Sequence, residues 1–179
     1  MLEIKIPAVR FYNDATSEFI NIPDTVLHLE HSLVSISKWE SKWHKTFLSN
    51  LEKTPEERLD YIRCMTLNKN VDPVVYYGLT NENIEEINSY IEDPMTATVM
   101  RKTEDHMPRK DKTTSELIYY WMIALNIPFE CQKWHLNRLL TLIEVCGRKN
   151  APPKKRGKKD MSARNRLNAE RRARLGSMG

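Results

Sequence analysis

The sequence predicts an α+β chain that is mainly helical: a small N-terminal β-hairpin or meander, a helical bundle with a C-terminal αα-hairpin, and a basic, conditionally helical tail. Three observations predict this fold class. Apolar and polar residues alternate in the first thirty residues, capped segments with helical apolar spacing follow, and the last 32 residues are rich in Lys and Arg.

The first thirty residues contain three predicted strands. Residues 2–6, "LEIKI", alternate apolar and charged side chains, as a strand with one buried face requires. Residues 18–22 and 25–29, "EFINI" and "TVLHL", are also extended in character and are bounded by Pro, Asn or Asp. Three short strands are barely enough for an independent sheet.

The middle of the chain has helical signals. Thr54 is followed by a Pro and by Glu57 three residues later, which is a capping box with Pro at the first helical position. Thr80 begins a second such segment. In residues 31–51 the apolar stripe of a helix comprises Leu33, Ile36, Trp43 and Phe47.

Residues 113–147 carry the strongest core signal and predict the αα-hairpin. Thr113 is the expected cap of the first helix, the pattern breaks at residues 126–128, and Gly147 is the expected stop of the second helix. We expect the hydrophobic centre of the protein here.

Charge is divided unevenly along the chain. The whole sequence has 28 Lys/Arg and 24 Asp/Glu, and residues 148–179 hold twelve of the basic residues and two of the acidic ones. Residues 1–147 therefore have a net charge of −6, and the remainder has +10. We expect a globular body over 1–147, a Pro/Lys-rich linker over 148–160 and a basic tail over 161–179 that becomes helical on meeting a partner.

The motifs of common enzymes are missing from the sequence. It has no Gly-rich phosphate loop and no G-x-S-x-G elbow. Cys131 and His135 are four residues apart, but no second pair completes a metal site, so a buried thiol and a hydrogen-bonded His is the favoured interpretation. We expect no enzyme, no catalytic residues, no metal and no cofactor.

The predicted partner-binding residues are aromatic and basic. Trp39 lies off the apolar stripe of its helix and is expected to be exposed, whereas helical spacing beside aliphatic residues also fits packing for the other tryptophans. The candidates are Trp39, Trp121, Trp134, Lys154, Lys155, Arg156, Lys158, Lys159, Arg164, Arg166, Arg171, Arg172 and Arg174.

The longest apolar run, residues 117–129, is too short for a bilayer span and contains a Pro. Residues 1–5 show no apolar signal core, and the three cysteines form no Cys-x-x-Cys motif. We therefore expect no membrane association and reduced thiols in a cytosol.

The segments "TSELIYYWMIALNIPFECQKWHLNRLLTLIEVC", "NAPPKK" and "RNRLNAERRARLG" make the chain similar to the tail assembly chaperones of tailed bacteriophages. The resemblance covers the C-terminal half well and the first hundred residues loosely. It implies a non-enzymatic protein that binds a helical client, such as the tape-measure protein, while tail tube subunits assemble, in the cytoplasm of the infected bacterial host.

Two alternatives remain open. One is a virion structural protein of the tail or head-tail region whose basic arm docks on neighbouring subunits, which would place the protein in the virion. The other is an accessory protein that binds nucleic acid through the tail. Self-association, with the tail of one copy on the acidic body of another, is a further hypothesis.

Overall fold

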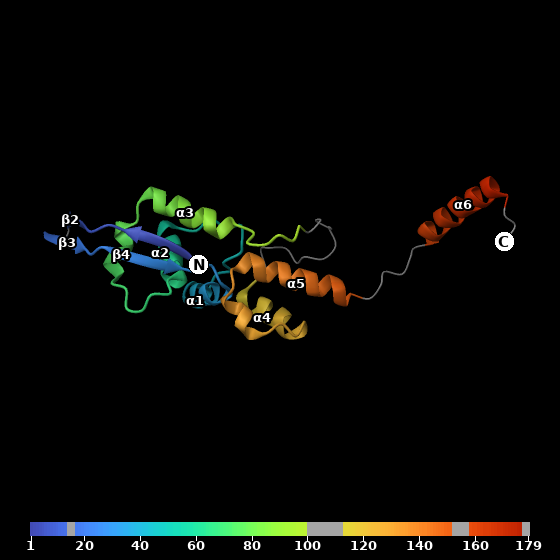
Figure 1. The fold of residues 1–179 in the computed structure, drawn as a ribbon. Helices are drawn as coiled ribbons and strands as arrows, with labels where there is room; N and C mark the ends of the chain where they lie inside the picture. Colours follow the sequence, from blue (N-terminus) through green and yellow to red (C-terminus); the bar gives the residue numbers. More distant parts are fainter. Residues whose placement is uncertain (14–16, 100–112, 152–157, 177–179) are drawn as a thin grey trace. The chain divides into compact units, whose positions relative to one another are not determined.

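The computed structural model describes residues 1–13, 17–99, 113–151 and 158–176 (Figure 1). The predicted fold class is confirmed: the chain is α+β and mainly helical, with a small antiparallel sheet at the N-terminal end. The chain divides into two units, residues 1–147 and 148–179.

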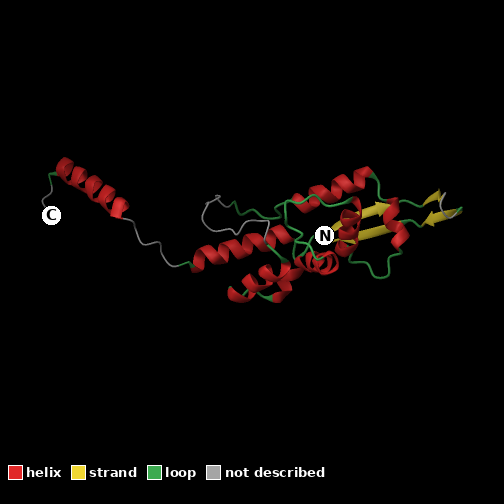
Figure 2. Ribbon diagram, turned by 180° about the vertical axis from the view of Figure 1, so that it is seen from behind, coloured by secondary structure: helices red, strands yellow, loops and turns green. Residues whose placement is uncertain are grey.

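The N-terminal strands form two antiparallel two-stranded ladders, and the pairing of residues in the second continues the register of the first. Strand β1 (Leu2–Ile6) pairs with β4 (Thr25–Leu29), and β2 (Val9–Asn13) pairs with β3 (Glu18–Ile22), all antiparallel (Figure 2). Pro7 lies between β1 and β2, Pro23 lies between β3 and β4, and neither residue has an N–H to donate to a ladder. The two prolines therefore account for the gap between the ladders.

The strands predicted at 2–6, 18–22 and 25–29 are confirmed, whereas β2 was missed. The outer edge of β4 is covered by the chain that follows the second helix, because the Leu67 N–H donates to the His28 carbonyl at 2.8 Å. The Asn68 side chain adds two bonds, accepting from the His28 N–H and donating to the Val26 carbonyl. This cover blocks an edge that would otherwise pair with another chain.

Helix α1 (Leu33–Trp43) packs against α2 (Pro55–Met65) and α4 (Ser115–Ala124). The 3-10 helix η1 (Pro73–Gly78) packs against β3, and α3 (Asn81–Glu92) packs against β1. The core includes residues from all these parts and Leu136: Ile4, Ile6, Ile22, Leu27, Leu29, Leu33, Ile36, Trp39, Met65, Val75, Ile87, Ile118, Met122 and Leu136. The hydrophobic centre is thus shared with the sheet and α1, not concentrated in residues 113–147 as expected.

The capping signals formed as predicted at two helices. Thr54 Oγ1 accepts a hydrogen bond from the Glu57 N–H at 3.2 Å, and the Glu57 carboxylate accepts one from the Thr54 N–H at 2.9 Å. Thr80 caps α3 in the same way. The predicted apolar stripe of the first helix included Phe47, but α1 ends before it, because His44 adopts a left-handed conformation (φ 52°). Phe47 belongs to the following loop and is buried.

The C-terminal helices differ from the prediction at their ends. Thr114, not Thr113, caps α4, and a 3-10 helix, η3 (Phe129–Lys133), precedes α5 (Leu136–Asn150). Helix α5 continues through Gly147. A β-carbon added to Gly147 would have no other atom within 4 Å. Arg148 and Lys149 occupy the last turn, where cations favour the helix dipole. Helix α5 ends at Asn150 and α6 (Lys158–Leu175) begins at Lys158, so both helices include residues of the segment 148–160 that was predicted as a linker.

Candidate docking surface

Helix α4 is apolar on almost every side. Its sequence, "SELIYYWMIA", contains one acidic or basic residue, Glu116. Only Ser115, Ile118 and Met122 are buried, on the side that meets α1. A helix that is apolar all round normally lies inside a protein. Much of α4 therefore presents apolar side chains to solvent.

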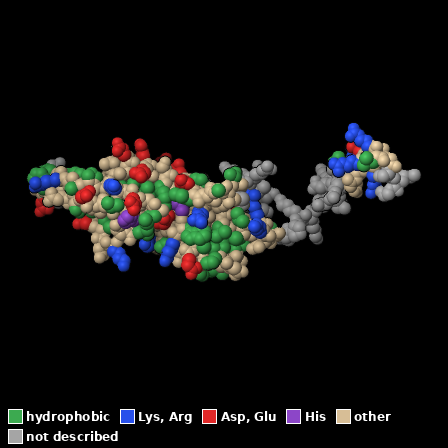
Figure 3. All heavy atoms as spheres, viewed as in Figure 1, with side chains coloured by type: hydrophobic (Ala, Val, Ile, Leu, Met, Phe, Trp, Pro, Cys, Tyr) green, Lys and Arg blue, Asp and Glu red, His purple; other side chains and the backbone are tan. Residues whose placement is uncertain are grey.

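Three exposed side chains and the half-buried Tyr119 form one surface, named here the α4 face: Tyr119, Tyr120, Ile123 and Phe129. Tyr120 is 62% exposed, Ile123 60% and Phe129 52%. Tyr119 and Tyr120 lie four and three residues before Ile123, so the three side chains are neighbours on the helix. The ring centroids of Tyr119 and Phe129 are 6.3 Å apart, which joins η3 to this surface. Figure 3 shows hydrophobic side chains gathered over α4.

The α4 face is held by anchored neighbours. The Tyr119 hydroxyl donates to Gln132 Oε1 at 2.9 Å, which fixes the aromatic ring between α4 and η3. At the start of α4, the buried Glu40 carboxylate accepts from the backbone N–H of Ser115 at 2.8 Å. This anion at a helix N-terminus satisfies an N–H that α4 itself cannot pair. The face is therefore preformed.

The prediction that Trp39 is exposed is wrong. Its side chain is 1% exposed, and its indole N–H donates to the Glu57 carbonyl at 2.9 Å. Its ring stacks with Trp43 and meets Phe47 edge-on. Trp39 follows Ile36 by three residues and precedes Trp43 by four, so it lies on the buried side of α1. There α2 and the loop after α1 close over it, so it is a core residue and cannot reach a partner.

The other two tryptophans have different environments. Trp121 is half-buried on α4. Trp134 is 37% exposed, and the Arg138 guanidinium carbon lies 4.5 Å from its ring centroid, a cation–π arrangement. Trp134 and Arg138 line a small cavity of about 280 Å³ together with Met1, Glu30, Tyr90, Met95, Lys133 and His135.

The polar groups of this cavity bond mainly to one another. Glu30 accepts from the Tyr90 hydroxyl at 2.7 Å and from the Met1 amino group at 2.9 Å. Burial, and then the Glu30 carboxylate, raise the pKa of Tyr90. The His135 Nε2 lies 2.9 Å from the Tyr90 carbonyl, so it carries the proton and donates. These bonds connect Met1, just before β1, and His135, just before α5, with Tyr90 of α3.

Next to the cavity, His31 is buried beside His135, with ring centroids 5.1 Å apart. Burial, with a smaller contribution from His135, lowers the pKa of His31 to about 3, so His31 is a neutral imidazole. Its Nδ1 is hydrogen-bonded to the Tyr61 hydroxyl at 2.5 Å. Cys131 is buried in η3, in line with the interpretation as a packed thiol. Among the side chains that the structure describes, no group of three or more His, Cys, Asp or Glu could hold a metal ion.

The predicted basic residues fall into three groups. Lys154, Lys155 and Arg156 lie outside the described residues. Lys158, Lys159 and Arg164 belong to α6 by backbone position, and their side chains are not described. The third group is exposed on α6: Arg166, Arg171, Arg172 and Arg174.

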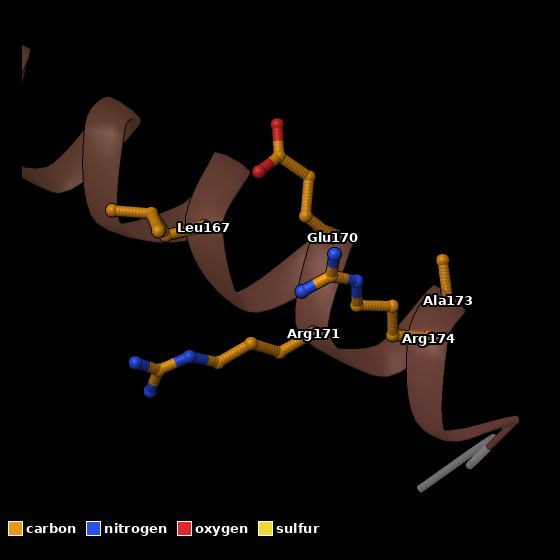
Figure 4. A pocket seen from close by; sticks show the side chains of 5 residues that line it. All are labelled: Leu167, Glu170, Arg171, Ala173 and Arg174. Carbon is orange, nitrogen blue, oxygen red and sulfur yellow. The ribbon is translucent and has the colours of Figure 1, made fainter.

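A hollow outlined on α6 is not a binding cleft. It is lined by Leu167, Glu170, Arg171, Ala173 and Arg174. Figure 4 shows that all five side chains come from one helix, so they outline an open helix surface. Among the described helices, none is long and apolar enough to cross a membrane.

Tyr120, Ile123 and Phe129 are not among the partner-binding residues predicted from the sequence, although Tyr120 was considered as a stacking platform for bases. The available signal was the composition of α4, because ten residues with one charge leave no polar side for solvent. That signal was interpreted as a buried helix. Comparisons with models of protein families, with curated proteins and with solved structures found no match to this chain.

Proposed function

We propose that this protein is a non-enzymatic tail assembly chaperone of a tailed bacteriophage, which binds an amphipathic helix of a client such as the tape-measure protein. The observation that carries the proposal is the α4 face, a preformed apolar surface on a helix that buries only one side. An amphipathic client helix that places apolar residues at intervals of three and four would match its spacing.

Charge favours the same kind of client. Two carboxylates, Glu116 and Glu130, are exposed beside the α4 face, and residues 1–147 carry a net charge of −6. A client helix with apolar residues on one side and Lys or Arg at its margins is complementary to this surface. The phage assignment itself rests on the sequence resemblance, which places the protein in the cytoplasm of the infected host.

Co-expression with the tape-measure protein from the same gene cluster tests the proposal. The wild-type chain should keep that protein soluble and co-purify with it, whereas the double variant Tyr120→Glu, Ile123→Glu should lose both properties. Both side chains are exposed, so the variant should unfold at the same denaturant concentration as wild type. Co-purification that survives the double substitution would refute the role of the α4 face.

A matched control uses apolar residues that are equally exposed elsewhere. Leu51 is 74% exposed and Leu67 is 55% exposed, and neither belongs to the α4 face. The double variant Leu51→Glu, Leu67→Glu should bind the tape-measure protein as wild type does. Equal loss in both double variants would show that added charge alone weakens binding.

One observation favours the alternative of a virion structural protein: residues 148–179 form a separate unit whose described arginines are all exposed, as an arm that docks on neighbours requires. In self-association, the arm of one copy would meet the acidic surface of α3 in another copy, where Glu82, Glu85 and Glu86 are exposed. Detection of the protein in purified particles would favour the virion alternative, and its absence from them favours the chaperone. Sedimentation at low and high salt tests self-association.

A further inference from the structure

We propose that α6 is a binding element for duplex DNA that enters the major groove and holds the phosphates on both sides of it. This inference does not depend on the chaperone proposal, because α6 and the α4 face belong to different units of the chain. Three properties of α6 support DNA binding: the arrangement of its cations around the helix, its dimensions and its shortage of apolar residues.

The described arginines of α6 surround the helix instead of forming a stripe. With 100° between successive residues, Arg171, Arg172 and Arg174 lie at about 140°, 240° and 80° from Arg166 around the axis. All four side chains are exposed. A flat acidic protein surface would meet only one or two of them. A groove with phosphates along both walls meets them from several directions at once.

The apolar content of α6 also excludes an ordinary protein-docking helix. By sequence its apolar residues larger than Ala are Met161, Leu167 and Leu175, at intervals of six and eight, and the side chains of Leu167 and Leu175 are 55% and 79% exposed. A helix that docks in a protein groove needs apolar anchors at intervals of three or four residues. These three residues do not supply that spacing. The cations are therefore the groups that a ligand of α6 must recognise.

The dimensions of α6 fit the major groove of duplex DNA and not that of duplex RNA. An α-helix with its side chains is about 10–12 Å across, and the major groove of B-DNA is about 12 Å wide and admits such a helix. The major groove of A-form RNA is too deep and narrow for side chains to read. The 18 residues of α6 give a length of about 27 Å, enough to cross the groove from one phosphate backbone to the other.

Binding should be electrostatic and should depend strongly on salt. Helix α6 contains seven Lys or Arg and two acidic residues, one of which, Glu170, lies 3.8 Å from Arg166 and is itself 67% exposed. Each cation that neutralises a phosphate releases counterions, so affinity falls steeply as salt rises. Sequence preference should be weak, because phosphate contacts carry no base information.

Fluorescence anisotropy of the full chain with a labelled duplex of about 20 base pairs tests the proposal. Replacing Arg166, Arg171, Arg172 and Arg174 by Gln should weaken binding at least about tenfold and reduce the slope of log affinity against log salt by roughly three. The control replaces four exposed cations of the body, Lys5, Lys38, Lys69 and Lys133, by Gln and should leave affinity within about twofold. Unchanged binding by the α6 variant, or equal loss in both variants, would overturn the proposal.

A second variant tests whether the helical conformation of α6 is needed when its charge is unchanged. Ala169→Pro breaks α6 in its interior and keeps every cation, so groove binding should weaken about tenfold. Ala151→Pro adds a proline outside α6 and should bind as wild type does. If Ala169→Pro binds DNA normally, a charged but unstructured tail suffices, and the groove proposal is wrong.

Other polyanions complete the test. Duplex DNA should bind at least about tenfold more tightly than single-stranded DNA, duplex RNA of the same length or poly-glutamate under the same salt. Equal affinity for duplex RNA would contradict the choice of groove. Equal affinity for poly-glutamate would show that α6 recognises acidic polypeptides, as the virion-arm alternative requires, and would likewise overturn the proposal.

Discussion

The carboxylate of Glu40, near the end of α1, accepts a hydrogen bond from the backbone N–H of Ser115, 75 residues later at the start of α4. Its other oxygen accepts from the Phe47 N–H at 2.8 Å, in the loop after α1. One buried side chain therefore fixes both the loop that closes the aromatic core and the helix that carries the α4 face. The proposed docking surface depends on a residue that lies outside it.

Replacing Glu40 should destabilise the protein strongly. Glu40→Ala leaves two backbone N–H groups without their acceptor and should lower the free energy of unfolding by about 3 kcal/mol, whereas Glu40→Gln, which keeps one acceptor oxygen, should cost about 1–2 kcal/mol. Glu116→Ala, at an exposed site in the first turn of α4, is the control and should cost less than about 1 kcal/mol. Urea unfolding measures all three, and equal costs for Glu40→Ala and Glu116→Ala would contradict the anchoring role.

Two glycine-to-alanine substitutions should have opposite effects. An added β-carbon on Gly78 would lie 2.8 Å from Ile6 Cγ2 and 3.0 Å from Ile22 Cδ1, so Gly78→Ala should destabilise by about 1–3 kcal/mol as η1 and the sheet move apart. Gly147→Ala meets no atom and lies inside α5, so it should stabilise by about 0.5–1 kcal/mol. Thermal unfolding of both variants checks the pair. A stabilising Gly78→Ala would show that η1 does not pack tightly on β1 and β3.

His31 should make stability depend on pH in the mildly acidic range. Its pKa is lowered to about 3 in the folded state, against about 6.5 when unfolded, so between these values the unfolded chain binds a proton that the folded chain does not. Stability is therefore unaffected by His31 above about pH 6.5 and falls as pH decreases towards 3, by up to about 1.4 kcal/mol per pH unit. Urea midpoints from pH 7 to pH 4 should fall less steeply in His31→Gln. Parallel curves for the two proteins would contradict this assignment.

Glu57 should contribute stability that acid removes. Its hydrogen bonds, first with Lys45 and then with the Thr54 backbone, lower its pKa, so the stabilisation is present above the unfolded pKa of about 4.3 and disappears as pH falls through the folded pKa. Lys45→Met removes the larger of these causes. It should destabilise the protein at pH 7 and have almost no effect once Glu57 is protonated. A penalty that stays the same at low pH would show that Lys45 acts through packing.

By itself the sequence determined the elements that depend on local chemistry. Strands β1, β3 and β4 follow from alternation and from Pro and Asn/Asp boundaries, and α2 and α3 follow from the capping residues Thr54 and Thr80. The acidic body and the basic C-terminal part follow from counting charges. These features are set by neighbours a few residues apart, so a single sequence contains what is needed to infer them.

Tertiary structure alone decided which apolar side chains are covered. Trp39 is an exception, because its spacing from Ile36 and Trp43 already places it on the apolar side of α1, where α2 and the loop after α1 bury it. The "LIYYWMI" stretch of α4 was predicted to lie at the hydrophobic centre, yet Tyr120 and Ile123 on its outer side are 62% and 60% exposed. Burial depends on which distant segments pack against a helix, and no local pattern records that. The α4 face, which carries the proposed function, could therefore be recognised only once the fold was known.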